Sequence, residues 1–151
     1  MVKVIYDIPT CEDYCALRIN AGMSPKTREA AEKGLPNALF TVTLYDKDRL
    51  IGMGRVIGDG GTVFQIVDVA VLKSYQGQGY GSQIMEHIMK YIKNVSVESA
   101  YFSLIADYPA DKLYAKFGFI PTEPDSGGLF IKKKKKKIVP INILSFLHSL
   151  T

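Results

Sequence analysis

The sequence predicts an α/β (α+β) fold, in which helices cover both faces of a mixed, mostly antiparallel central sheet. Three observations lead to this prediction. β-rich runs alternate with segments of helical periodicity, two of these runs are separated by only three residues, and the most apolar run leads through glycines into an amphipathic segment. The expected order of elements is βααβββαβαββ. A length of 151 residues suits a single domain.

The N-terminal part is expected to form one strand and two helices. VKVIYDI (2–8) has the composition of a strand. Thr10, with an acidic residue three positions on, resembles a capping box and predicts a helix over 10–20. Ser24 followed by proline predicts the start of a second helix, which a glycine ends at position 34.

Three strands are expected next. ALFTVTLYD (38–46) and LIGMGRVIG (50–58) are β-rich and closely spaced, which is typical of an antiparallel hairpin. TVFQIVDVAVL (62–72) is almost wholly apolar, as expected of a strand with both faces covered.

The second half is expected to add two helices and three strands. Apolar residues recur at helical spacing over 84–92, which predicts a helix packed on the sheet. SAYFSLIAD (99–107) has strand composition, and PADKLYAKF (109–117) places a proline in the first turn of a helix. GFIPTEP (118–124) and GGLFI (127–131) are predicted as the last two short strands.

The charge distribution argues against a nucleic-acid partner. The net charge is +4, but residues 1–131 carry 13 Lys and Arg against 15 Asp and Glu, a net of −2, and the other six lysines form the single run 132–137. A phosphate-binding face needs basic residues spread over a folded surface. No apolar stretch of about 20 residues and no signal sequence appears, so neither a membrane partner nor secretion is expected.

Cys11 and Cys15 lie four residues apart on an expected helix, without the geometry that a disulfide prefers. A cytoplasmic location is therefore predicted. The expected domain covers 1–131, and 132–151, the lysine run with an apolar tail, is predicted to lie outside the fold. Three interpretations of this tail stay open: a disordered natural extension, a membrane-surface segment, and an artefact such as a frameshift.

A glycine-rich junction, QGQGYG (76–81), separates the apolar strand from the amphipathic helix. The first turn of that helix presents unpaired N–H groups and the positive end of its dipole, and glycines let a diphosphate approach them. Ser82 adds a hydroxyl donor. The simpler alternative is that the glycines only allow a tight turn. A Walker loop and a dinucleotide fold are excluded, since neither the residues after Gly81 nor the position in the strand order fit them.

The junction resembles the signature of the GNAT superfamily of acetyl-CoA-dependent N-acetyltransferases, with Gln76, Gly79 and Gly81 at its Gln/Arg-x-x-Gly-x-Gly/Ala positions. LYAKFGF (113–119) is similar to the family's LYxKxGF segment and follows in the right order. The resemblance covers about residues 1–131. It implies transfer of an acetyl group from acetyl-CoA (coenzyme A) to a primary amine, with no metal.

The resemblance also implies which residues hold the cofactor. The fourth strand would diverge from the fifth and pair its backbone, at Val69 and Val71, with the pantetheine arm. Asp107 stands where the family usually has Asn, which puts that side-chain contact in doubt. The expected cofactor-binding residues are Val69, Ala70, Val71, Gln76, Gly77, Gln78, Gly79, Tyr80, Gly81, Ser82, Asp107 and Tyr114.

Two residues are candidates for catalysis. Tyr114 falls on the position where the family often has a tyrosine that protonates the leaving thiolate; the alternative is that its ring packs under the pantetheine. Asp68 is the only carboxylate in the apolar strand, where an unpaired charge is costly. It is predicted either to act as the base or to orient the amine, and a structural hydrogen-bonding role is the alternative.

Acceptor specificity in this family comes largely from the first two helices, their loop and nearby strand ends. A small-molecule amine is expected, such as an amino acid, a polyamine or an amine-containing antibiotic. Alternatives are an acyl-CoA-binding sensor or interaction module without turnover, and a protein N-terminal or lysine acetyltransferase. A monomer or a homodimer is expected. Arg18 and Arg55 could bind an acceptor carboxylate or form ordinary ion pairs. The candidate acceptor-binding residues are Arg18, Asn20, Met23, Ser24, Arg55 and Phe64.

Overall fold

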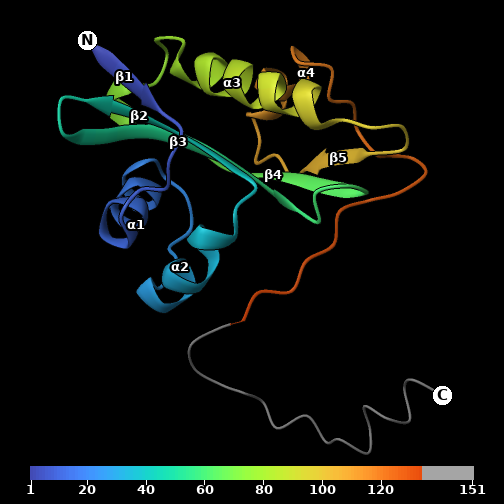
Figure 1. Cartoon of the computed structure of the whole chain (residues 1–151), viewed down its shortest axis with the longest axis horizontal. Helices are drawn as coiled ribbons and strands as arrows, with labels where there is room; N and C mark the ends of the chain where they lie inside the picture. The colour runs from blue at the N-terminus through green and yellow to red at the C-terminus, as the bar shows by residue number, and fades with distance from the viewer. Residues whose placement is uncertain (134–151) are drawn as a thin grey trace, which may run out of the picture. The chain divides into compact units, whose positions relative to one another are not determined.

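The structure is a computed structural model that describes residues 1–133 (Figure 1). The chain divides into two compact units, Met1–Ile120 and Pro121–Thr151. Most of the predicted tail, 132–151, lies outside the described residues. No helix within 1–133 is long and apolar enough to cross a membrane.

Within residues 1–133, the helices and strands all belong to the first unit and follow the predicted order up to the fourth helix. Short 3-10 turns, η1 and η2, follow α2 and β4. In chain order the elements are β1 (Val2–Ile5), α1 (Cys11–Asn20), α2 (Arg28–Gly34), η1 (Leu35–Asn37), β2 (Phe40–Asp46), β3 (Arg49–Gly58), β4 (Val63–Val71), η2 (Lys73–Tyr75), α3 (Tyr80–Val95), β5 (Tyr101–Leu104) and α4 (Asp111–Ala115).

The five strands form one sheet in the order β1-β2-β3-β4-β5. Strands β1 to β4 pair antiparallel, and β5 pairs parallel to β4. Helices α1 and α2 lie on one face, and α3 and α4 on the other (Figure 1). The predicted fold class, a mixed and mostly antiparallel sheet with helices on both faces, is confirmed.

Helix α3 packs directly on the sheet because β3 carries a glycine beneath it. A Cβ atom at Gly54 would lie 2.7 Å from the side chain of Ile84 and 2.8 Å from that of Ile88. Both isoleucines are fully buried. This close packing fixes the position of the N-terminus of α3 relative to β4. That N-terminus forms part of the site described below.

Of the two helix starts predicted in the N-terminal part, at Thr10 and at Ser24, the first is correct. The hydroxyl of Thr10 accepts a hydrogen bond from the amide of Asp13 at 3.1 Å, which confirms the first cap. The second helix begins at Arg28 rather than near Ser24, because Thr27 caps it by accepting from the amide of Ala30. Ser24 is bound elsewhere, as described below.

The two predicted last strands, 118–124 and 127–131, do not form. After β5 the described residues contain no further strand. Pro121 and Pro124 have no N–H to donate to a sheet, and the side chains of 121–133 are exposed, so no burial would stabilise a strand there. Within 121–133, a turn joins Thr122 and Ser126 instead.

Candidate functional site

Strand β4 continues beyond its pairing with β5. Residues Val63–Ile66 pair with Tyr101–Leu104, where β5 ends, whereas Val67–Val71 pair only with β3. The edge of β4 that faces away from β3 is therefore unpaired over its last part. This is the divergence of the fourth and fifth strands that the sequence predicts, and it leaves the backbone at Val69 and Val71 next to an open edge.

A β-bulge lies at the start of the open edge. Met53 pairs with Ala70 and Arg55 with Val67, so Asp68 and Val69 together oppose the single residue Gly54. Asp68 has φ 56°, in the left-handed region. A non-glycine residue in this region is sterically disfavoured, and it persists only where its surroundings hold it.

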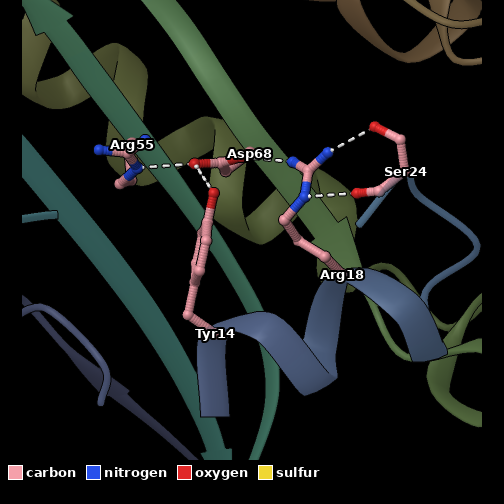
Figure 2. Close-up of polar contacts among 5 residues, drawn as sticks. All are labelled: Tyr14, Arg18, Ser24, Arg55 and Asp68. Carbon is pink, nitrogen blue, oxygen red and sulfur yellow. Dashed lines mark hydrogen bonds and ion pairs between the residues drawn. The ribbon is translucent and has the colours of Figure 1, made fainter. Parts of the chain in front are cut away.

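A polar cluster holds Asp68 in this conformation (Figure 2). Its Oδ1 accepts from Nη1 of Arg18 at 2.6 Å. Its Oδ2 accepts from Nε of Arg55 at 2.7 Å and from the hydroxyl of Tyr14 at 3.0 Å. Arg18 also donates from Nε to the carbonyl of Ser24 at 2.9 Å and from Nη2 to its hydroxyl at 3.1 Å. We call these five residues, Tyr14, Arg18, Ser24, Arg55 and Asp68, the Asp68 cluster.

The ion pairs of the cluster are buried. The side chains of Arg18, Arg55 and Asp68 are 7%, 11% and 5% exposed. Burial, followed by the charge of Asp68, raises the pKa of Tyr14 to about 12, so its hydroxyl is a hydrogen-bond donor at neutral pH. The guanidinium of Arg55 also lies over the ring of Tyr14, 5.9 Å from its centroid. The cluster thus ties α1 and the loop after it to the bulge in β4.

This geometry bears on three sequence predictions. Asp68 accepts hydrogen bonds from three donors, two of them guanidinium groups, and its side chain is only 5% exposed, so little of the carboxylate is open to an amine. The arrangement favours the orienting and structural roles of Asp68 over that of a base. Arg18 uses all three of its nitrogens within the cluster, whereas Arg55 uses only Nε.

The glycine loop, residues 76–81, has the backbone geometry that its composition predicts. Gly77 has φ 79° and Gly79, the N-cap of α3, has φ 88°. A Cβ atom at either position would meet no protein atom within 4 Å. Glycine adopts these left-handed backbone angles without steric strain, and the space beside both positions is open.

The first turn of α3 offers unpaired amides to this open space. The intrahelical hydrogen bonds begin with the amide of Gln83, which donates to the carbonyl of Gly79 at 3.1 Å. The amides of Tyr80, Gly81 and Ser82 precede it and have no carbonyl one turn back within the helix. Because α3 has 16 residues, its dipole adds positive potential at this end. The site fits a diphosphate.

Other contacts fix the shape of the loop. The side-chain Nε2 of Gln76 donates to the carbonyl of Val71 at 2.8 Å, and the side-chain Nε2 of Gln78 donates to the carbonyl of Ser74 at 3.2 Å. These two predicted cofactor residues thus direct their side-chain amides to the loop's own backbone. A Cβ at Gly81 would lie 3.3 Å from the side chain of Leu113, so this glycine lets α4 approach.

Tyr114 lies on α4 next to Leu113 and is 8% exposed. Burial, and then the negative charge of Asp107, raise the pKa of its hydroxyl above the usual value. Asp107 itself is exposed, within the segment 105–110 that leads from β5 to α4. A neutral phenol of this kind can donate a proton but is a poor base at neutral pH.

The remaining predicted acceptor residues do not join the Asp68 cluster. Phe64 is buried in the core and stacks on Phe102, with ring centroids 4.5 Å apart. Met23 is half-buried against the core. Asn20 lines a pocket between α1 and the β2–β3 turn, together with Asp13, Ala16, Leu17, Asp46, Lys47, Asp48, Arg49, Leu50 and Leu72. None of the other predicted site residues lines this pocket.

Sequence reasoning did not identify Tyr14. A signal existed, because Tyr14, Leu17 and Arg18 are spaced to share one face of α1, and all three are buried. An arginine on the apolar face of a helix indicates a buried carboxylate partner. The sequence also placed Ser24 at a helix cap, and its contact with Arg18 could not be read from spacing.

Comparisons with known proteins agree with this geometry. The model of the acetyltransferase (GNAT) family matches residues 5–119. An uncharacterized N-acetyltransferase ycf52-like protein from Prochlorococcus marinus is 31% identical over 104 residues, which are 66% of this chain and 57% of that protein. The chain thus spans little more than half the length of this relative.

Two solved structures extend the likeness. A protein of unknown function from meticillin-resistant Staphylococcus aureus, described as a probable acetyltransferase, is 92% identical with a TM-score of 0.86, over 88% of this chain and all of that one. A GNAT family acetyltransferase from Streptococcus pneumoniae is 25% identical with a TM-score of 0.69, over 90% of this chain and all of that one.

Proposed function

Because the chain belongs to the acetyltransferase (GNAT) family, we propose that it transfers an acetyl group from acetyl-CoA to the primary amine of a small molecule. Family membership supports acetyl transfer in general. The observation that carries the proposal further is the glycine loop at the start of α3, next to the unpaired edge of β4. We further propose that the protein acts in the cytoplasm.

The residues of the loop and of β4 would hold the cofactor. The amides of Tyr80, Gly81 and Ser82 would bind the diphosphate, while the open backbone at Val69 and Val71 would pair with the pantetheine arm. When bound, acetyl-CoA supplies an activated acetyl thioester. The left-handed angles at Gly77 and Gly79 and the open space beside them support this assignment.

Three groups of this chain would assist the reaction. The backbone amides at the β4 bulge would polarise the thioester carbonyl, Asp68 would hold that bulge in shape, and Tyr114 would donate a proton from its hydroxyl. The raised pKa of Tyr114 supports this last role because it keeps the phenol protonated. Since donors occupy both Asp68 oxygens, we propose that water deprotonates the amine.

The proposal is tested with acetyl-CoA and a panel of amines, by following thiol release and confirming the acetylated product by mass spectrometry. The panel contains free amino acids, polyamines, amine-containing antibiotics and peptides with free N-termini or lysines. We expect turnover with small amines and not with peptides. Preferential acetylation of peptides would replace the proposal with a protein acetyltransferase, and binding of acetyl-CoA without turnover of any amine would favour a sensor.

A further inference from the structure

Arg55 differs from Arg18 in how completely its guanidinium is used. Arg18 donates from Nε, Nη1 and Nη2, all to Asp68 or Ser24. Arg55 donates only from Nε, to Asp68, and neither of its outer nitrogens forms a hydrogen bond within residues 1–133. Figure 2 shows this difference, since a single dashed line joins Arg55 to the rest of the cluster.

The outer nitrogens of Arg55 are not sealed from solvent although the side chain is nearly buried. Within the described part of the chain, no side-chain nitrogen or oxygen that is sealed from solvent lacks a partner. The outer nitrogens lack one, so they are accessible, while the side chain as a whole is only 11% exposed. An arginine held in this way presents fixed donors at the surface and loses little rotamer entropy on binding.

The cluster also carries an uncompensated charge. Arg18 and Arg55 contribute two positive charges, Asp68 contributes one negative charge, and Tyr14 is neutral because its pKa is about 12. Among residues 1–133, no second carboxylate forms an ion pair with either guanidinium. A buried net positive charge is stabilised by an anion, and two adjacent guanidinium nitrogens suit a carboxylate or a phosphate.

The position of Arg55 relates this charge to the reaction. Arg55 pairs with Val67 at the β-bulge, where β4 has just passed the end of β5. We propose that Arg55 is a specificity-determining residue that binds an anionic group, carboxylate or phosphate, of the acceptor amine through its two outer nitrogens. This inference rests on the proposed function. It excludes polyamines as preferred acceptors, because their positive charges would be repelled.

The test compares matched pairs of acceptors that differ only in the anionic group. Free amino acids are paired with their carboxamides, and O-phosphoethanolamine with ethanolamine, so that the two arms distinguish carboxylate from phosphate. We expect the wild-type kcat/KM to favour the anionic member of at least one pair by about 10- to 100-fold, the range expected for charged hydrogen bonds. Equal use of both members in every pair would overturn the inference.

Variants assign the preference to one side chain. Arg55→Gln removes the charge and should abolish the preference, so that kcat/KM, mainly through KM, falls more for the anionic acceptor than for its neutral partner. Denaturant unfolding of the same variant measures the separate loss of stability from its contact with Asp68. Arg55→Lys keeps the positive charge and should retain part of the preference for the anionic acceptor. Arg28→Gln is the matched control, since Arg28 is 77% exposed and pairs only with Glu32. An Arg55→Gln enzyme that slows both members equally would contradict the assignment.

A binding measurement keeps the inference testable if no amine is turned over. N-acetyl amino acids and their amides, and N-acetylated O-phosphoethanolamine with N-acetylethanolamine, are titrated into the CoA-bound protein by calorimetry. A preference for the acid or phosphate that Arg55→Gln removes would support the inference even where the proposed function fails. Absence of any such preference in the wild-type protein would overturn it, although acetyl transfer itself could still occur.

Discussion

The glycine loop and the Asp68 cluster lie at the two ends of one strand segment and are built on opposite principles. The loop precedes α3 and is shaped by backbone angles, with open space beside Gly77 and Gly79. The cluster surrounds Asp68 at the bulge, where three donors, from Tyr14, Arg18 and Arg55, bind its buried carboxylate. The space beside the loop glycines is open, whereas side chains surround Asp68 and hold the bulge of β4 in shape.

This difference determines what a substitution does in each region. In the loop, a side chain would meet no protein atom at Gly79, so the change acts on whatever binds there and on the backbone angle. In the cluster, removing one group leaves the others buried without partners, so the change acts first on folding. Loop variants should therefore alter cofactor affinity, and cluster variants should alter stability.

The largest effect is expected at Tyr114, which follows Leu113, the residue whose side chain lies beside Gly81 of the loop. Tyr114→Phe keeps the ring and removes the proton donor, so kcat should fall by about 10² to 10⁴. Acetyl-CoA affinity, measured by calorimetry, should be unchanged. The rate is best measured in single turnover, and a wild-type rate there would show that the tyrosine only packs.

Asp68→Ala should destabilise the fold by about 3–5 kcal/mol, because it leaves two buried guanidinium groups without their carboxylate. Denaturant unfolding measures the change. Arg28→Ala is the control, and loss of its exposed pair with Glu32 should leave the unfolding midpoint close to that of the wild type. If Asp68→Ala unfolded at the wild-type midpoint, the cluster would not be what holds the bulge.

Gly79→Glu should weaken CoA binding by about 100-fold or more, because it places a carboxylate beside the proposed diphosphate site. Gly79→Gln has the same bulk and the same backbone strain without the charge, so the difference between the two variants isolates electrostatics. Calorimetry with CoA gives both affinities. Unchanged affinity in a folded Gly79→Glu protein would move the phosphate site elsewhere.

Gly77→Ala should have the smallest effect of the four substitutions. Its φ of 79° is left-handed and no atom lies within 4 Å of an added Cβ, so only the backbone strain of about 1–2 kcal/mol is expected. The melting temperature should fall by a few degrees while CoA affinity changes little. A loss of affinity as large as that of Gly79→Glu would indicate that the ligand also contacts Gly77.

The sequence predicted features that depend on local chemistry. The Thr10 cap, the alternation of strands and helices, the glycine loop and the divergence of β4 from β5 all follow from short motifs or from a family resemblance based on them. The cap at Ser24 and the strands over 118–124 and 127–131 were wrong. The local pattern was compatible with each predicted element. Ser24 instead accepts a hydrogen bond from Arg18, and residues 121–133 lack the burial that would stabilise a strand.

By itself the sequence determined the loop, because glycine adopts the left-handed angles of Gly77 and Gly79 without steric strain and a contiguous motif reports that preference directly. Only the tertiary structure decided the roles of the charged residues. Arg18, Arg55 and Asp68 come from three different elements, α1, β3 and β4, and folding brings them together in a buried cluster. A guanidinium that folding pairs completely is structural, whereas one left with open donors can bind a ligand, and no spacing along the chain distinguishes the two.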